Sequence, residues 1–291
     1  MLAFPVLITV TVGGAAWLLG RGMAPEAAVA IAIGTGYLFI GGFERVFPLH
    51  RSWLRSHGDL GEDVGLFATN AAVANFVQPV VFAGAVAVYG WLAARTGTGL
   101  WPHAWSWPAQ LVLALVIGEF FEYSFHRLMH EVPVLWRFHA THHSATRLYW
   151  LNAVRFHPLD LFLVSTVRLS ALLLLGCGEE VVALVLVFSG VHGSFQHANL
   201  PVRLGPLNWV FSMAELHRWH HSKNVAEANR NYGGNLILWD VLFRTRFLPQ
   251  DREPPPDVGI DDMPAFPHGL LAQLAVPFRW EQVRREARGR P

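Results

Sequence analysis

The sequence predicts an all-α protein, a polytopic bundle of membrane helices with a helical cap on one side. Hydrophobic residues make up 53% of the 291 residues and charged residues only 15%, whereas a globular domain carries about 25% charged residues. The mean hydropathy is positive, at +0.32. The uncharged residues are concentrated in long runs, and nothing in the chain supplies the polar outer shell that a large soluble helical protein needs.

Four uncharged runs come first along the chain. Residues 5–20, 27–43 and 64–94 carry no charge, and residues 108–118 are apolar up to Glu119. A membrane-spanning helix needs about 20 apolar residues. Allowing for polar flanks at the interface, each run predicts one transmembrane helix.

Two later runs are shorter. Residues 161–175 are apolar except for Arg168, and residues 181–191 are uncharged. They fit either two short spans or a helical hairpin that enters one leaflet, with Gly-Cys-Gly at 176–178 as its tip. Cys177 is the single cysteine, so an intramolecular disulfide or a thiolate metal cluster is excluded. We expect it to be a small buried residue.

Basic residues in the short loops predict the orientation. The 44–63 loop holds Arg45, Arg51 and Arg55, against one arginine in each neighbouring loop. This bias places the 44–63 loop, the N-terminus and everything after Phe125 on the cytoplasmic side. The first run lacks the basic flank and cleavage site of a signal peptide, so we interpret it as a retained span. We expect an integral, multi-pass protein of a bacterial inner membrane.

We divide the chain into three regions: membrane helices at 1–107, a region with most of the histidines at 108–248, and a tail at 249–291. Residues 249–257 are rich in proline and typical of an extended linker. Residues 278–290 are rich in arginine and fit either a basic helix on the membrane face or a frayed tail. The net charge of +1 gives no indication of nucleic-acid binding.

The 15 histidines are unevenly placed, and three clusters stand out. The first, His-x-x-x-His, follows an apolar run directly, and the second and third are both His-x-x-His-His. On a helix, positions i, i+3 and i+4 share a face, so each cluster can present its imidazoles to one point. The clusters are His126 and His130; His139, His142 and His143; and His217, His220 and His221.

This many imidazoles predicts a metal site. Neutral imidazole is a ligand for iron, zinc, copper or nickel. Eight clustered rings exceed what one tetrahedral ion can use, so we expect two ions. Without metal, the rings would crowd together with unmet hydrogen bonds. We expect His197 to complete the shell, with His157 and His192 as further candidates.

The first cluster lies at the end of a predicted span, and a soluble stretch follows the third. The predicted metal site therefore lies at the boundary between membrane and cytoplasm. A substrate would reach it sideways from the bilayer, which indicates a lipid.

The order of these clusters resembles the fatty acid hydroxylase superfamily, also called the sterol desaturase family. Other segments resemble it as well, and together they cover residues 108 to 248, which the resemblance makes a catalytic domain. These segments are Arg155-Phe-His-Pro-Leu-Asp160, Phe195-Gln-His-Ala-Asn199, Leu204-Gly-Pro-Leu-Asn-Trp209, Glu215-Leu-His-Arg-Trp-His-His-Ser222 and Asn231-Tyr-Gly-Gly-Asn-Leu-Ile-Leu-Trp-Asp240.

The resemblance implies a membrane-bound, non-haem di-iron monooxygenase that uses O2 to hydroxylate a C–H bond of a lipid, such as a fatty acyl chain, a sterol or a carotenoid. It also implies an external electron donor, a ferredoxin or a cytochrome with its reductase, since the chain shows no dinucleotide or haem motif. By resemblance the ligands of the two iron ions are His126, His130, His139, His142, His143, His197, His217, His220 and His221.

Two histidines are assigned less firmly. His192 lies five residues before His197, off the i+4 face of a helix. It can be a ligand, a residue that supports a ligand, or a structural histidine near the end of a span. His157 is likewise a candidate only.

A ligating imidazole usually donates its other N–H to a carboxylate or a carbonyl. Asp240, which resembles the family's Trp-Asp, is the first candidate for such a partner. Asp160, Glu122 and Glu119 are further candidates. The two glutamates could instead lie at the interface or pair with Arg127.

Three alternatives remain at this stage. A desaturase would use the same site and differ only in the fate of the substrate radical. A metal transporter would need a path of ionisable groups through the spans, but the spans before His126 are nearly free of charge. A scaffold protein with a degenerate site would not be expected to keep three intact clusters. The sequence does not indicate the lipid, the oxidised carbon or the oligomeric state.

Overall fold

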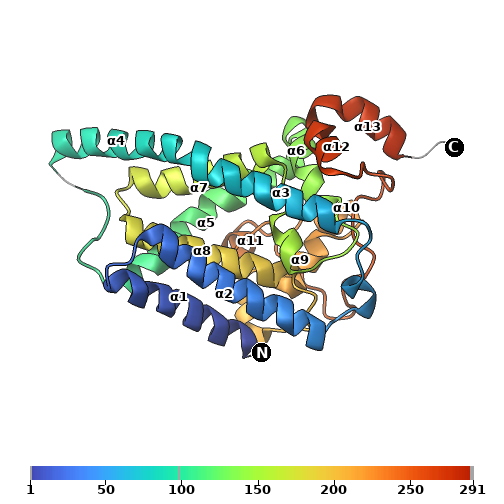
Figure 1. Cartoon of the computed structure of the whole chain (residues 1–291), viewed down its shortest axis with the longest axis horizontal. Coiled ribbons are helices and arrows are strands. Elements are labelled where there is room, and N and C mark those ends of the chain that lie inside the picture. Colours follow the sequence, from blue (N-terminus) through green and yellow to red (C-terminus); the bar gives the residue numbers. More distant parts are fainter. Residues whose placement is uncertain (1, 98, 289–291) are drawn as a thin grey trace.

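The structure is a computed structural model in which residues 2–97 and 99–288 are described. These residues form helices joined by loops, with no β-strand among them and only two isolated β-bridges. Figure 1 shows the long helices lying side by side along the longest axis. The predicted all-α fold class is confirmed.

Within the described residues, four helices are long and apolar enough to cross a membrane. They coincide with the four predicted spans, and the multi-pass membrane architecture is confirmed. They are α1 (Ala3–Gly20), α2 (Pro25–Val46), the continuous helix Leu60–Thr96, and α5 (Trp107–Glu131).

The continuous helix is built from three pieces: α3 (Leu60–Ala72), the π-helical turn η2 (Val73–Val77) and α4 (Gln78–Thr96). The π-turn lies just before Pro79, whose ring cannot follow a regular α-helical turn without a clash. The helix ends at Gly97, which has a left-handed φ of 69°. In Figure 1, α4 extends along the edge of the bundle beyond its neighbours.

The two later runs form helices α7 (Pro158–Leu174) and α8 (Glu179–His197), joined by a turn that contains Gly176 at φ 89°. Neither belongs to the four candidate spans. Helix α7 packs against α4 and α5, whereas α8 packs against α1 and α2. The two helices therefore diverge from their common turn, and this leaves space between them.

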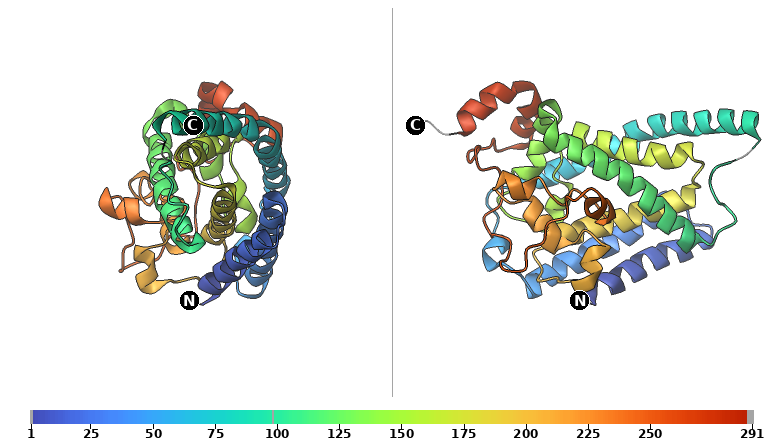
Figure 2. Two further views of the ribbon diagram at one scale, coloured as in Figure 1. Left: turned by 90° about the vertical axis from the view of Figure 1, so that its left-hand side faces the viewer. Right: turned by 180° about the vertical axis from the view of Figure 1, so that it is seen from behind.

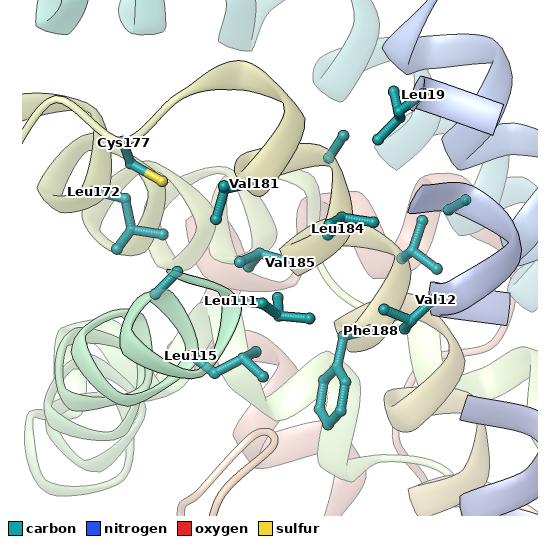
Figure 3. Close-up of a cluster of buried hydrophobic side chains, with 14 of the residues drawn as sticks. Val12, Leu19, Leu111, Leu115, Leu172, Cys177, Val181, Leu184, Val185 and Phe188 are labelled. Carbon is teal, nitrogen blue, oxygen red and sulfur yellow. The ribbon is translucent and has the colours of Figure 1, made fainter. Parts of the chain in front are cut away.

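An apolar core fills the end of the bundle near this turn. It forms where α8 meets α1, α5 and α7, and Cys177 is buried in it, as expected (Figure 3). Its side chains include Val12, Leu19, Leu111, Leu115, Leu172, Val181, Leu184, Val185 and Phe188.

Shorter helices form a cap at the opposite end of the bundle. Figures 1 and 2 show the 47–59 segment at the same end as α6 and α9. A buried ion pair joins the cap to a span, since Arg155 contacts Asp63 at 2.5 Å and Glu62 at 2.9 Å. The cap elements are α6 (Pro133–His143), α9 (Ala214–His220), α10 (Val225–Ala228), and the 3-10 turns η1 (Arg51–Leu54), η3 (Trp150–Val154) and η4 (Gly205–Trp209). Helix α11 (Leu238–Leu242) packs against α5 nearer the middle of the bundle (Figure 1).

The tail folds back onto the cap. It contains α12 (Leu270–Ala275), η5 (Val276–Arg279) and α13 (Trp280–Ala287). Trp280, Val283 and Ala287 pack with Ala140 of α6, so residues 280–287 are a docked helix rather than a frayed end. Residues 289 and 290 of the predicted basic segment lie outside the described residues.

The proline-rich residues 249–257 form no helix. Two ion pairs hold them to the cap, Arg203–Glu253 at 2.6 Å and Arg252–Glu227 at 2.7 Å. The predicted linker is thus non-helical, and it lies against the protein.

Candidate metal centre

The three histidine clusters converge at the junction of the bundle and the cap. The first lies on the last turns of α5, the second on the end of α6, and the third on α9 and the residue after it. Helix α8 ends at His197, which faces them. Helix α6 begins at Pro133, a residue favoured in the first turn of a helix, so the chain turns sharply after α5 and brings the first two clusters together.

The nine predicted ligands form two groups. In each group, one ligand atom from every residue lies within 4.8 Å of all the others. The first group is His126, His130, His139, His143 and His220, and the second is His142, His197, His217 and His221.

The expectation that each cluster points to one place is wrong for both His-x-x-His-His motifs. His139 and His143 enter the first group, whereas His142 between them enters the second. In the third cluster, His217 and His221 enter the second group, whereas His220 between them enters the first. The reason is helical geometry: residues four apart are nearly aligned, whereas the residue at i+3 lies about 100° round the helix from i+4.

Ring nitrogens approach one another closely inside each group. The Nε2 atoms of His126 and His139 are 3.0 Å apart, and Nε2 of His217 lies 2.9 Å from Nε2 of His197 and 3.1 Å from Nε2 of His221. Two nitrogens that bind one ion at about 2.0–2.1 Å are themselves roughly 3 Å apart. The observed separations are therefore those of neighbouring ligands.

Oxygen atoms behind the rings select the tautomer. Carbonyl and carboxylate oxygens only accept, so a ring with Nδ1 against such an oxygen carries its proton there and leaves a lone pair on Nε2. His126 Nδ1 donates to the carbonyl of Tyr232 at 2.6 Å, and His139 Nδ1 donates to Asp160 at 2.8 Å. Two lone pairs then face each other at 3.0 Å, which is repulsive unless a cation lies between them.

Three more rings are held in the same way. His220 Nδ1 donates to the carbonyl of Arg230 at 2.8 Å. His130 Nδ1 donates to Asn229 Oδ1 and His197 Nδ1 to Asn152 Oδ1, each at 3.0 Å.

Several of these buried rings keep a nitrogen without a hydrogen-bond partner among the described residues. In the first group this is Nε2 of His130, His143 and His220. A buried, unmet polar atom is costly, and a metal ion would engage all three. The donor set and its orphaned nitrogens therefore fit a pair of metal ions.

Burial also keeps the rings in their ligating form. It lowers the pKa of His142, His143, His217, His220 and His221 well below 6.5, and the neighbouring imidazoles lower it further. Neutral imidazole, the form that binds metals, is thus favoured at neutral pH.

The two weaker candidates lie elsewhere. His157 precedes the first turn of α7, where its Nδ1 accepts from the backbone N–H of Leu159 and its Nε2 donates to the carbonyl of Leu274. His192 is buried among aromatic rings, stacked on Phe188 and edge-on to Phe4. Neither joins the two groups.

The carboxylates predicted to lie behind the ligands have different roles. Asp160 contacts His139 directly. Asp240 does not contact a ligand. It accepts hydrogen bonds from the backbone N–H groups of Tyr232 and Gly233, and it thereby fixes the Tyr232 carbonyl that accepts from His126. Burial raises the pKa of Asp240 to about 6, and its hydrogen bonds oppose the rise.

Glu122 does not contact a ligand, contrary to the prediction. It pairs with Arg168 at 2.6 Å. Glu119 accepts from the backbone and side chain of Asn235 at 3.0 Å. The alternative partner, Arg127, pairs with Glu131 instead. The partners of Glu122 and Glu119 lie 46 and 116 positions away in the sequence, so local spacing could not identify them.

Sequence reasoning missed Asn152, Asn229 and the two carbonyl groups. Asparagine is common in loops, and a carbonyl belongs to every residue, so neither leaves a distinctive pattern. The one available signal was that the block from Asn231 to Asp240 resembles the family's closing segment.

An apolar cavity of about 360 Å³ opens onto both groups. It lies between α2, α7 and α8, in the space left by the diverging hairpin, and five of the site histidines line it. These are His126, His139, His142, His197 and His217. Such a cavity can hold an apolar chain with one carbon against the metal centre.

Comparison with known proteins gives consistent matches. The sequence model described as fatty acid hydroxylase matches residues 111–245. The ornithine lipid hydroxylase OlsE of Rhizobium tropici is 40% identical over 238 residues, which are 81% of this chain and 71% of that protein.

More distant relatives are larger proteins. Alkylglycerol monooxygenase of Xenopus tropicalis is 30% identical over 68% of this chain and 44% of its own length. Methylsterol monooxygenase 1 of Rattus norvegicus is 26% identical over 45% of this chain and 44% of its own length. The chain thus spans less than half of either protein. No solved structure matches.

Proposed function

The chain belongs to the fatty acid hydroxylase family, whose relatives are lipid hydroxylases and monooxygenases, and from this premise we propose that it is a di-iron monooxygenase that hydroxylates a membrane lipid. The observation that carries the proposal is the pair of imidazole groups, four and five rings, at the wall of one apolar cavity. The membrane-bound oxidoreductase class follows from the family, whereas the metal and its number are our inference.

The donor set supports iron. Imidazole binds iron and zinc alike, but zinc has no redox chemistry, and the relatives are named as oxygenases. The first group would be held by the rings of α5, α6 and α9, and the second by those of α6, α8 and α9. When bound, the two ions supply the activation of O2 and the oxidation of the C–H bond.

The remaining work falls to the chain itself. The oxygens of Tyr232, Asp160 and Asn152 hold the rings at fixed orientations. The apolar residues of α7 and α8 exclude water and align the lipid chain. No side chain is required as a nucleophile.

The reaction needs electrons from outside. Hydroxylation of R–H by O2 takes up two electrons and two protons and yields R–OH and water. We propose a ferredoxin, or a cytochrome with its reductase, as the donor, because the sequence contains no dinucleotide or haem motif. Turnover of the purified protein with NAD(P)H alone would contradict this part of the proposal.

We also propose that the metal centre lies on the cytoplasmic side of a bacterial inner membrane. The 47–59 segment, with its predicted positive-inside arginines, lies at the same end of the bundle as the metal centre (Figure 1). A reporter enzyme that works only in the cytoplasm should be active when it is fused after residue 288. A reporter that works only on the opposite side of the membrane should be inactive there, and its activity would show that the proposed orientation is reversed.

The test of the whole proposal combines metal analysis with isotope labelling. Detergent-purified protein is analysed for metals, and lipids are extracted from an expressing host grown under 18O2. We expect about two iron ions per chain and 18O in a new lipid hydroxyl that is absent from a host expressing His217→Ala. Two irons with a new double bond and no 18O would identify a desaturase. Folded protein without a transition metal would overturn the proposal.

A further inference from the structure

Four polar side chains of the cavity wall contact one another and form a strip. Arg168 of α7, Glu122 of α5, Ser189 of α8 and Asn235 of the closing segment all line the cavity. Arg168 is 8% exposed and Asn235 is 3% exposed. Ionisable side chains within a membrane bundle are costly and commonly mark a functional pathway or site.

The strip is held together by its own contacts. Arg168 donates through Nη1 to Glu122 Oε2 at 2.6 Å and through Nη2 to Ser189 at 3.0 Å. The amide nitrogen of Asn235 donates to Glu119 at 3.0 Å and to Glu122 at 3.3 Å. Because the Glu122 carboxylate is paired with Arg168 and only accepts, the amide of Asn235 is oriented with its nitrogen toward the glutamates.

Two atoms of the strip keep unused hydrogen-bonding capacity. Arg168 Nε and Asn235 Oδ1 are buried, and neither has a hydrogen-bond partner among the residues that the structure describes. One is a donor and the other an acceptor. Both residues line the cavity, and an unmet buried donor and acceptor are costly unless a bound group engages them.

The strip lies close to the metal centre. Glu122 precedes His126 by one helical turn on α5, a rise of about 6 Å. On the other side, Asn235 follows Tyr232, whose carbonyl fixes the His126 ring. A group bound at the strip is therefore only a few bonds away from a carbon placed against the first group of histidines.

The charges of the strip indicate what kind of group it would bind. Arg168 is already neutralised by Glu122, so a ligand carboxylate would face the Glu122 carboxylate without compensation. A ligand ammonium would in turn lie beside the Arg168 guanidinium. A hydroxyl or an amide both accepts and donates, and so matches the free Nε and Oδ1.

We propose that this strip recognises an uncharged hydroxyl or amide group of the lipid and thereby directs oxidation to a carbon a few bonds from that group. This inference rests on the proposed function, because it assigns the substrate class of the same site. It predicts that unfunctionalised ends of acyl chains are not oxidised.

The first test measures binding, without catalysis. Metal-free protein in detergent is titrated with 1-decanol or with undecane, which has a methyl group in place of the hydroxyl, and binding is followed by thermal shift. A net hydrogen bond contributes about 1 kcal/mol, so wild type should bind decanol roughly five- to tenfold more tightly than undecane. Equal affinity would overturn the proposal.

Variants test whether the strip causes the preference for decanol over undecane. Arg168→Lys keeps a cation beside Glu122 but removes Nε. The double variant Glu122→Met/Arg168→Met removes the ion pair without leaving a single buried charge. Both should lose the preference for decanol and still bind undecane. Val164→Met, on the same wall of the cavity, should keep the preference. A preference that survives Arg168→Lys, or that Val164→Met also abolishes, would contradict the assignment.

The product separates this inference from the proposed function. If 18O enters a lipid far from any hydroxyl or amide, the function stands and the strip is not a recognition site. If no 18O enters any lipid, the function fails, whereas the decanol measurement still reports on the strip.

Discussion

Nδ1 of His139 lies 2.8 Å from Oδ2 of Asp160, and both side chains are sealed from solvent. The carboxylate fixes the ring with its Nε2 toward Nε2 of His126. Removal of such a partner typically weakens metal binding about 10- to 100-fold. Asp160→Ala should therefore lose iron during dialysis against a chelator that leaves wild type loaded, as measured by metal analysis. Asp262→Ala, at an exposed ion pair, is the control, and equal retention by both variants would count against the role of Asp160.

His192 and His221 should respond oppositely to substitution. His221 lies in the second group, whereas His192 lies among aromatic rings outside both groups. His221→Leu should reduce the iron content by about one ion per chain, while His192→Leu should leave it unchanged. Metal analysis of the two folded variants decides the matter, and loss of iron from His192→Leu would add that residue to the ligands.

The metal-free protein should lose stability on acidification. Burial lowers the pKa of five site histidines below the value of about 6.5 that they have when unfolded. The unfolded chain then binds more protons below pH 6.5, so the free energy of unfolding falls as the pH falls, by about 1.4 kcal/mol per pH unit for each such group. The raised pKa of Asp240, about 6, acts in the opposite direction but for a single group.

Thermal unfolding of metal-free protein between pH 7 and pH 5 measures this effect. The unfolding temperature should decrease steadily over that interval. A temperature that stays constant or rises would show that the rings are not buried in their neutral form.

Gly193 offers a way to fill the lipid cavity. It lines the cavity, and an added Cβ would meet nothing within 4 Å. Gly193→Leu should extend a side chain into the space for the substrate and lower the rate of lipid hydroxylation by tenfold or more, an effect of about 1.4 kcal/mol, with iron content unchanged. Gly84→Leu, which also meets open space but lies on exposed α4, should retain full activity. Wild-type rates in both variants would exclude this cavity as the route of the substrate.

The sequence predicted the spans and the eight clustered histidines because both depend on short-range periodicity. An uncharged run such as 64–94 has few structural options, and His126 with His130 must share a helix face. The division of the rings between two groups was not predictable, since it depends on how α6 and α9 are rotated when they meet. The partner of Glu122 was missed for a similar reason: Arg168 lies 46 positions away, on a helix whose packing no local pattern describes.

Helices α6 and α9 each contribute rings to both groups, and this has a consequence for how the ions load. Capture of a first ion would immobilise both helices and so place most ligands of the second group before the second ion arrives. The entropy lost in ordering them would then be incurred once rather than twice. Loading should therefore be cooperative, with a Hill coefficient above one, and partly filled preparations should contain empty and doubly loaded molecules rather than molecules with a single ion.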